Sequence, residues 1–166
     1  MSELLIGCGA SRDKRMHVEG NAAWQALTTL DYLPEFGTDI VHDLNIRPWP
    51  VPDASFDEVH AYEVLEHLGR QGDAPSFFAD FTEIHRILKP GGVLCATVPS
   101  EKSIWAWGDP SHTRIINLGS LAFLDPSINQ DNRAASRFPY WKGRFKRLWH
   151  EDNETFFMFV LQKVSP

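Results

Sequence analysis

The clearest potential for chemistry lies near the amino terminus, where a short apolar run is followed at once by two glycines. Residues 4–6 are Leu-Leu-Ile, and Gly7-Cys8-Gly9 comes directly after them. Glycines at the end of a strand let the backbone turn sharply and approach a ligand without an intervening Cβ atom. The segment therefore predicts a ligand-binding turn.

Asp31 is a second candidate, because it follows a predicted strand that ends at Leu30. A carboxylate at that place can accept hydrogen bonds from both ribose hydroxyls of a nucleoside. The dinucleotide fingerprint would need a third glycine three residues after Gly9, where this chain has Arg12. The two features together indicate a nucleoside-type cofactor, and they leave NAD and S-adenosylmethionine both open.

The elements that must position these residues are short apolar runs separated by turns. Between residues 75 and 88, apolar side chains recur at spacings of four, three and four residues, which predicts a helix. Asp73 can cap its start, and Pro90-Gly91-Gly92 can end it. No such period occurs between Gly9 and Asp31, so no long helix is expected there. Strands are expected over residues 4–6, 39–44, 56–62 and 93–98, with another ending at Leu30.

The last third of the chain has a different character. Residues 100–140 are polar and broken by prolines, which is typical of a functional loop or lid. Two runs, 142–149 and 155–163, are joined by residues 150–154 and predict an antiparallel hairpin. In the first run, alternation places Trp141, Phe145 and Trp149 on one face and Lys142, Arg144 and Lys146 on the other.

These elements predict one α/β domain over residues 1–166, with a Rossmann-like open, mostly parallel sheet. Helices are expected on both faces of the sheet, and a C-terminal antiparallel hairpin completes it. Residues 1–99 would form the cofactor-binding part, residues 100–140 the lid of the acceptor site, and residues 141–166 the hairpin. The ligand is expected at the carboxyl ends of the strands.

Composition excludes several classes of protein. The formal net charge of −6 disfavours nucleic acid as a partner, because such binding draws on clustered Lys and Arg. No apolar run approaches a membrane span, and no secretory signal is evident, so a cytoplasmic protein is expected. Cys8 and Cys95 lie in apolar runs and are expected to be buried thiols. No metal-ligand spacing of Cys and His occurs, so no metal is predicted.

In order and spacing, the motifs resemble the class I S-adenosylmethionine-dependent methyltransferases, in the type 11-like branch with small bacterial and phage-borne members. A further stretch, Asp109 to Arg114, is similar to a D-P-x-H-x-R segment found after the fifth strand in some of these members. The resemblance runs from residue 4 to about residue 99. The matching motifs are Leu5-Ile6-Gly7-Cys8-Gly9, Asp31, Asp43-Leu44, Ser55-Phe56-Asp57, Val64-Leu65-Glu66-His67-Leu68 and Leu88-Lys89-Pro90-Gly91-Gly92.

The resemblance implies S-adenosylmethionine as the cofactor and assigns residues to its parts. The glycine turn, Gly7 to Gly9 with Cys8 between, would pass beneath the methionine part. Asp31, followed by Tyr32, would bind the ribose, and Asp43 with Leu44 would meet the adenine. The residues expected to line the sulfonium and take the amino group are Ala61, Tyr62 and Glu63.

Two histidines are candidate bases for an acceptor hydroxyl or amine. His67 follows Glu63 and Glu66 at helical spacing, although it can equally hydrogen-bond a loop. His112 lies in the predicted lid, where Trp105 and Trp107 would bury an apolar part of the acceptor and Arg114 would clamp an anion. The sequence leaves open whether the acceptor is a small molecule, a sugar or a protein side chain. It also leaves open whether the protein forms a homo-oligomer.

Some features depart from the family or favour other functions. Many members place helices before the first strand, whereas this strand begins by Glu3. The acceptor site would then be covered by residues 100–140, by a partner subunit, or not at all. Tyr62-Glu63-Val64-Leu65 differs from the motif of DNA amino-methyltransferases, which disfavours base methylation. A non-catalytic S-adenosylmethionine-binding or assembly module remains an alternative. An NAD-linked oxidoreductase is another, weakened by the missing third glycine.

Overall fold

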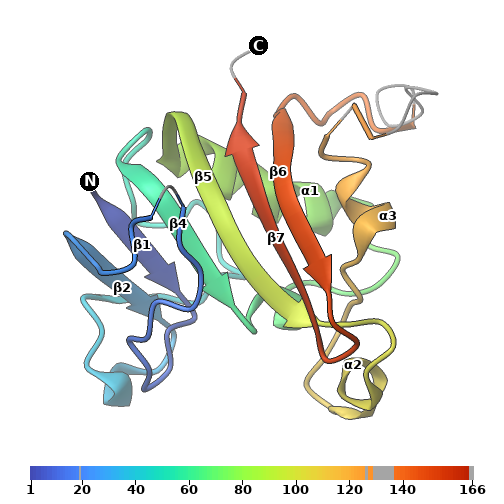
Figure 1. Ribbon diagram of the computed structural model, residues 1–166, viewed down its shortest axis with the longest axis horizontal. Helices are drawn as coiled ribbons and strands as arrows, with labels where there is room; N and C mark the ends of the chain where they lie inside the picture. Colours follow the sequence, from blue (N-terminus) through green and yellow to red (C-terminus); the bar gives the residue numbers. More distant parts are fainter. Residues whose placement is uncertain (19, 126, 129–136, 165–166) are drawn as a thin grey trace.

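A seven-stranded β-sheet carries the fold in the computed structural model, which describes residues 1–18, 20–125, 127–128 and 137–164 (Figure 1). Its strands are β1 (Glu3–Ile6), β2 (Leu27–Asp31), β3 (Ile40–Val41), β4 (Phe56–Tyr62), β5 (Leu88–Pro99), β6 (Phe145–Asp152) and β7 (Phe156–Lys163). Between them in the chain lie η1 (Pro34–Phe36), η2 (Leu65–His67), α1 (Ala74–Ile87), α2 (Ile104–Gly108) and α3 (Leu118–Leu121).

The strand order is β3-β2-β1-β4-β5-β7-β6. β1 pairs in parallel with β2 and β4, and β4 pairs in parallel with β5, whereas β7 is antiparallel to both β5 and β6. The order reverses between β1 and β4, and ligands of open α/β sheets bind at such a reversal, outside the carboxyl ends of the strands. The predicted Rossmann-like class with a C-terminal antiparallel hairpin is confirmed.

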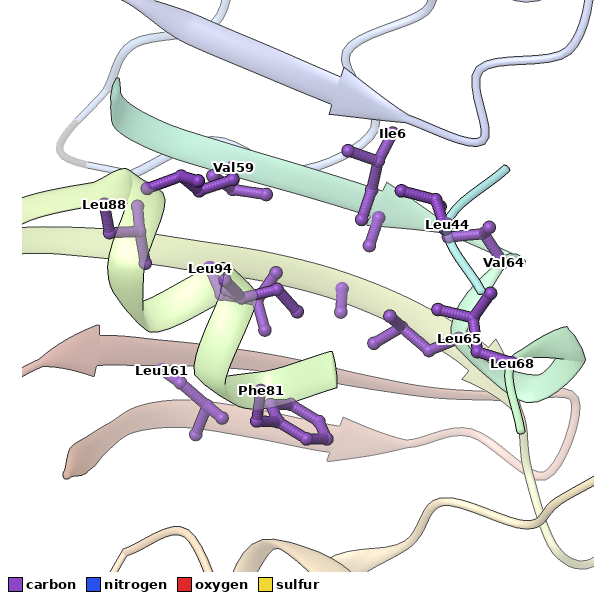
Figure 2. Packing of buried hydrophobic residues seen from close by; sticks show 14 of the residues in the cluster. Ile6, Leu44, Val59, Val64, Leu65, Leu68, Phe81, Leu88, Leu94 and Leu161 are labelled. Atoms are coloured by element: carbon purple, nitrogen blue, oxygen red, sulfur yellow. The ribbon is translucent and has the colours of Figure 1, made fainter. Parts of the chain in front are cut away.

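One face of the sheet is covered by α1, which begins and ends within one residue of the predicted helix. Asp73 caps it as expected, because its side chain accepts a hydrogen bond from the backbone N–H of Ser76 at 3.1 Å. Phe81 and Ile84 of α1 are buried in the same apolar cluster as Val59 of β4. Figure 2 shows Phe81 beside Leu161 of β7. Burying such side chains fully stabilises the fold by about 1.5 to 3 kcal/mol each.

The opposite face is covered by the irregular segment between β1 and β2, which passes in front of the sheet in Figure 1. Met16 and Trp24 of this segment pack with Leu5, Cys95 and Val160 in a second apolar cluster. The prediction of helices on both faces therefore needs a correction on this face. Residues 7–18 and 20–26 contain no helix, because their apolar side chains lack a helical period, as the sequence indicates.

Two strands differ in length from the prediction. β3 has only two residues instead of 39–44, because Ile40 and Val41 alone pair with β2 and the chain then turns, with Ile46 N–H donating to Asp43 O at 2.9 Å. β5 is longer than 93–98 and begins at Leu88 directly after α1. The Pro-Gly-Gly segment thus lies within β5 and not in a loop that ends the helix.

The C-terminal hairpin is confirmed, but its turn lies at residues 153–155, later than predicted. The alternation predicted that Trp149 shares the buried face of Phe145, and this prediction is wrong. Phe145 is 1% exposed, whereas Trp149 is 42% exposed. The pairing of β6 with β7 shifts register between Arg147 and Trp149, and an extra residue in one strand reverses the alternation of side chains beyond it.

Both cysteines are free and buried, as the apolar runs around them predict. Cys8 follows β1, and Cys95 lies in the middle of β5. In the described part of the chain, no helix has the length and apolar character needed to cross a bilayer.

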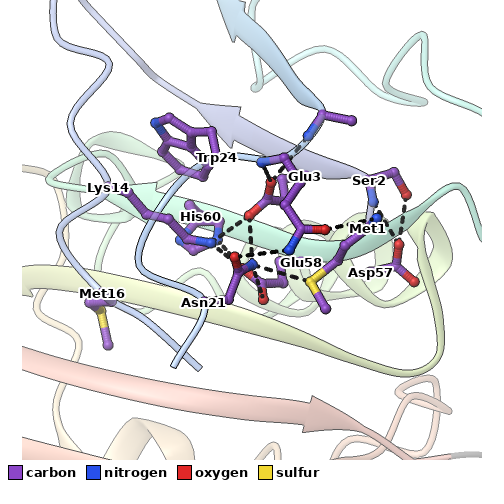
Figure 3. Close-up of polar contacts among 12 residues, drawn as sticks. Met1, Ser2, Glu3, Lys14, Met16, Asn21, Trp24, Asp57, Glu58 and His60 are labelled. Carbon is purple, nitrogen blue, oxygen red and sulfur yellow. Dashed lines mark hydrogen bonds and ion pairs between the residues drawn. The ribbon is translucent and has the colours of Figure 1, made fainter. Parts of the chain in front are cut away.

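A buried ionic cluster ties β1 and β4 to the irregular segment (Figure 3). The Lys14 ammonium lies 2.5 Å from Glu3 Oε1 and 3.0 Å from Glu58 Oε2. His60 Nε2–H donates to Glu58 Oε2 at 2.9 Å, and its Nδ1 lies 2.6 Å from the Tyr62 hydroxyl. Burial disfavours the charged carboxylate, but hydrogen bonds from His60 and Lys14 outweigh it and lower the pKa of Glu58 to about 2.

This cluster predicts a loss of stability in acid. The pKa of Glu58 is lower in the fold than in the unfolded chain, so its contribution is present above about pH 4.5 and is lost as the pH falls toward 2. We expect the free energy of unfolding to fall over this range by on the order of 2 kcal/mol more in the wild type than in Glu58→Gln. Denaturant titrations from pH 7 to pH 3 measure it.

Glu151→Gln, at an exposed position of β6, is the control and should behave as the wild type. Equal pH dependence in Glu58→Gln and the wild type would contradict the assignment.

Candidate cofactor-binding site

A pocket of about 470 Å³ opens at the carboxyl ends of β1, β2 and β4. Cofactor and small-molecule sites have volumes of about 300 to 1,000 Å³, so the pocket is large enough for a nucleoside cofactor. Residues predicted to bind the cofactor supply much of its wall, and the candidate base His67 joins them. The lining comprises Gly7, Asp31, Tyr32, Asp43, Leu44, Glu63 and His67 from the prediction, with His42, Asn45, Val64, Leu68 and Ser111 in addition.

Gly7 brings the end of β1 close to the end of β4. Its φ is +59°, a left-handed conformation that glycine adopts far more readily than other residues. A Cβ atom on Gly7 would lie 2.3 Å from Cγ2 of Val64. The pocket wall therefore requires a bare Cα at this position. Gly9 is also left-handed, with φ +52°, but a Cβ there would meet no atom within 4 Å.

Asp31 lies at the end of β2 with its side chain at the pocket wall. Its Oδ2 accepts a hydrogen bond from Gly9 N–H at 2.9 Å, and its Oδ1 accepts one from Leu33 N–H at 3.1 Å. A carboxylate has roughly four acceptor positions, so about two remain for a ligand. Asp31 can thus hold the glycine turn and still accept hydrogen bonds from hydroxyl groups.

Leu44 and Asp43 lie on a tight turn after β3. Leu44 is buried, and its carbonyl accepts a hydrogen bond from Trp49 Nε1–H at 2.9 Å. Asp43 Oδ1 accepts from Asn45 N–H at 2.8 Å, which fixes the turn. The turn presents one apolar and one acidic side chain to the pocket. Their neighbours His42 and Asn45 carry no motif of their own, and only their place beside Asp43-Leu44 could have indicated them.

The residues at the end of β4 divide between the two faces of the sheet. Glu63 reaches the pocket with φ +55°, an uncommon conformation for a residue with a side chain. Its Oε1 accepts from Thr97 Oγ1–H at 2.7 Å, while burial raises the pKa of its carboxyl. Ala61 and Tyr62 are buried and do not line the pocket, and the Tyr62 side chain packs in the second apolar cluster. Cys8 is buried as well and lies outside the lining.

Two segments meet beside the pocket and bring His67 next to His112. Thr113 N–H and Arg114 N–H both donate to the backbone carbonyl of Glu66, at 2.9 and 3.2 Å. The two imidazole rings consequently lie edge to face, with centroids 4.8 Å apart. The structure thus brings together both histidines that the sequence analysis singled out, although they are 45 positions apart in the chain.

Glu66 projects between these histidines from η2. Its Oε1 lies 4.0 Å from His67 Nε2 and 3.9 Å from His112 Nε2. The side chain is 2% exposed, and neither of its oxygens has a hydrogen-bond partner. Burial, reinforced by the charges of Glu63 and Asp109, raises the pKa of Glu66 to about 8. The sequence indicates Glu66 only as part of the motif Val64 to Leu68 and as a neighbour of His67, without a role of its own.

The segment predicted as a lid is only partly exposed. Trp105 and Trp107 on α2 are 61% and 72% exposed, so they are free to contact an acceptor. Arg114 is buried, and its guanidinium donates to Asp80 Oδ2 of α1 at 2.6 Å. The prediction of Arg114 as an anion clamp is therefore corrected, because this side chain ties the segment to the core. Residues 126 and 129–136 of the predicted lid lie outside the described residues.

A family model described as "Methyltransferase domain" matches residues 4–96, which is more than half of the chain. The chain belongs to this family. The matched range of the methyltransferase domain runs from β1 into β5 and includes both glycines, Asp31 and Glu63. The family resemblance drawn from the ordered motifs is confirmed.

Among curated proteins, the methyltransferase domain is similar to a probable S-adenosylmethionine-dependent methyltransferase of Mycolicibacterium smegmatis. The two are 37% identical over 90 residues, which make up 52% of this chain and 32% of the relative. A sterol 24-C-methyltransferase of Eremothecium gossypii is 41% identical over 64 residues, 39% of this chain and 16% of the relative. The chain thus spans a third or less of the length of these relatives.

Solved structures share the fold of the methyltransferase domain. A SAM-dependent methyltransferase from Archaeoglobus fulgidus superimposes with a TM-score of 0.63 and 16% identity, over 98% of this chain and 86% of the other. The N-methyltransferase NodS from Bradyrhizobium japonicum, in complex with S-adenosyl-L-homocysteine, gives a TM-score of 0.59 at 16% identity, over 99% and 78%. S-adenosylmethionine, the cofactor predicted from the sequence, agrees with these findings.

The contact between Gly7 and Val64 predicts unequal effects of two alanine substitutions. Gly7→Ala and Gly9→Ala both place a side chain in a left-handed conformation, at a cost of roughly 1 to 2 kcal/mol each. Gly7→Ala must also displace the Val64 side chain. This overpacking should lower the free energy of unfolding by roughly another 1 to 3 kcal/mol. We expect Gly7→Ala to show the lower free energy of unfolding and the weaker binding of S-adenosylhomocysteine. Denaturant unfolding and calorimetry measure both. Equal losses in the two variants would argue against the close contact.

Proposed function

We propose that the protein is an S-adenosylmethionine-dependent methyltransferase whose cofactor binds in the pocket at the ends of β1, β2 and β4. The observation that carries the proposal is that Gly7 and Asp31 line the same pocket. Gly7 lines the pocket where β1 approaches Val64 too closely for a side chain, and Asp31 keeps acceptor positions free in the same pocket of about 470 Å³. Membership of the methyltransferase family supports the same reading.

We assign the parts of the cofactor to the pocket residues as the resemblance implies. Asp31 would accept hydrogen bonds from the ribose hydroxyls, with Tyr32 beside it. Asp43 and Leu44 would hold the adenine, the acid taking its amino group and the leucine covering the ring. The glycine turn and the end of β4 would hold the methionine part and the sulfonium, with Gly7 and Glu63 at the pocket wall. Cys8, Gly9, Ala61 and Tyr62, which lie outside the lining, would contribute through their backbone.

The backbone after the glycine turn argues against a dinucleotide. A pyrophosphate binds where a helix begins directly after the glycines, because free N–H groups and the helix dipole point at it. Here Arg12 occupies the place of the third glycine, and its guanidinium donates to the carbonyls of Gly9 and Phe36 at 2.8 and 2.9 Å. No helix begins in residues 7–18 or 20–26. The oxidoreductase alternative is therefore weakened further.

Bound S-adenosylmethionine supplies a methyl group on a positively charged sulfur. The protein then has to hold an acceptor in line with the bond from sulfur to methyl and to exclude water. Glu63, half-buried at the pocket wall and hydrogen-bonded by Thr97, would orient the charged centre. We propose that His67 and His112 activate the acceptor. Removal of the proton from the acceptor's hydroxyl or amine would raise the rate of methyl transfer by on the order of 100-fold.

The acceptor that the site suits is a small molecule, a sugar or a protein side chain, approached from the side of His67 and Ser111. Trp105 and Trp107 offer exposed aromatic surface on α2, which we propose covers an apolar part of the acceptor. A non-catalytic cofactor-binding module is the second candidate. Cofactor binding without turnover on any acceptor would favour the module.

Ligand binding tests the proposed cofactor. We expect calorimetry to detect S-adenosylmethionine and S-adenosylhomocysteine in the micromolar range and to detect no NAD. Asp31→Asn should weaken binding of S-adenosylhomocysteine by about 1.5 to 3 kcal/mol, because a charged acceptor is lost while one carbonyl oxygen still serves the turn. Glu35→Ala, at an exposed position of η1, is the matched control. Binding of NAD but not of S-adenosylmethionine would overturn the proposal.

A further inference from the structure

We propose that Glu66, His67 and His112 form a binding site for a divalent transition-metal ion such as Zn²⁺. The metal site itself stands on the geometry of these side chains. A role for the ion in activating a methyl acceptor rests, in addition, on the proposed function.

The three potential metal-binding atoms lie close together. Glu66 Oε1, His67 Nε2 and His112 Nε2 all lie within 4.8 Å of one another, and the two distances to the carboxylate are 4.0 and 3.9 Å. Bonds of about 2.0 to 2.2 Å to zinc place tetrahedral donors about 3.3 to 3.5 Å apart. To reach this spacing, the two distances to the carboxylate must shorten by about 0.4 to 0.7 Å, and the distance between the two Nε2 atoms by at most about 1.5 Å.

Both imidazoles are oriented for metal binding by their other ring nitrogen. His67 Nδ1 lies 3.1 Å from the carbonyl oxygen of Ser111, and His112 Nδ1 lies 2.8 Å from that of Trp105. A carbonyl only accepts hydrogen bonds, so each Nδ1 must carry the proton and donate it. In its neutral form, each ring with this tautomer presents the lone pair of Nε2 toward Glu66. Metal-binding histidines are typically fixed by such a bond to a backbone carbonyl.

Without a cation, no group in the described part of the chain satisfies the Glu66 carboxyl at the centre of this cluster. The Glu66 carboxylate is 2% exposed, and both of its oxygens lack a hydrogen-bond partner, as few buried polar groups do. A second carboxylate adds negative charge, because Asp109 Oδ2 lies 3.8 Å from His112 Nε2. A divalent cation would bind all three donor atoms and stabilise the ionised form of this buried carboxyl group.

A comparable cluster elsewhere in the chain shows how the protein itself can supply the cation. Glu3, Glu58 and His60 also gather three donor atoms, but the Lys14 ammonium lies among them and pairs with both carboxylates (Figure 3). In the part of the chain that the structure describes, no lysine or arginine pairs with Glu66. The cluster of Glu66, His67 and His112 therefore gathers three metal-binding atoms, as the cluster of Glu3, Glu58 and His60 does. Unlike that cluster, it is not paired with a lysine or arginine of the described chain.

The proposed metal site adjoins the cofactor pocket, so a bound ion could contact the methyl acceptor. His67 and Ser111 line the cofactor pocket, and two histidines with one glutamate leave the fourth position of a tetrahedral ion open. An oxygen bound at that position has its pKa lowered, so an acceptor hydroxyl would release its proton to solvent and become the nucleophile. The imidazoles then serve as ligands to the ion and not as bases.

The test uses the full chain, freed of metal with a chelator, and the metal alone as the probe. We expect calorimetry to show one Zn²⁺ per chain with micromolar or tighter affinity. Co²⁺ in its place should give the visible absorption of a four- or five-coordinate ion with nitrogen and oxygen donors. Failure of the wild type to bind either ion would overturn the proposal.

Variants then locate the site. Glu66→Gln and His112→Ala should each weaken Zn²⁺ binding by at least about tenfold, whereas His17→Ala, at an exposed histidine, should bind as the wild type. If Glu66→Gln is unfolded by circular dichroism, His112→Ala and the cobalt spectrum of the wild type decide. Unchanged zinc affinity in the folded ligand variants would assign the ion elsewhere and contradict the proposal.

Binding of S-adenosylhomocysteine, measured on the same samples, separates this inference from the proposed function. Zinc binding that depends on Glu66 together with no binding of S-adenosylhomocysteine would retain the metal site and reject the proposed function. The reverse result would reject the metal site and retain the methyltransferase assignment.

Discussion

The close approach of Gly7 to Val64 is the constraint on which the site depends. It occurs where the order of the sheet reverses, so it fixes the gap between the ends of β1 and β4. On one side of that gap the glycine turn is tied to Asp31. On the other side the chain continues from Val64 into η2, which carries Glu66 and His67. One contact without room for a side chain thus aligns the cofactor pocket with the histidine cluster.

The parts of the fold that follow from short-range patterns could be predicted from the sequence. The strand over residues 56–62 and the helix α1 with its Asp73 cap agree with prediction, because apolar spacing and local hydrogen bonding decide both. Features that depend on partner strands could not be predicted. The exposure of Trp149 follows from a register shift between β6 and β7, which no pattern within β6 reveals.

The same division holds for the candidate site. Glycine spacing and a strand-end acid indicated Gly7 and Asp31, because residues at the ends of neighbouring strands meet in an open sheet. The family resemblance implied Glu63. The cluster around Glu66 has no such signal. It forms because Thr113 and Arg114 hydrogen-bond the carbonyl of Glu66 across 47 and 48 positions of chain, so the spacing carries no metal-ligand pattern.

The central claim is that this pocket binds the cofactor, and a crystal structure with S-adenosylhomocysteine tests it most directly. The account predicts the ribose hydroxyls within hydrogen-bonding distance of the Asp31 carboxylate and the sulfur on the side of Glu63 and His67. Product bound elsewhere, or a ribose that makes no contact with Asp31, would contradict it.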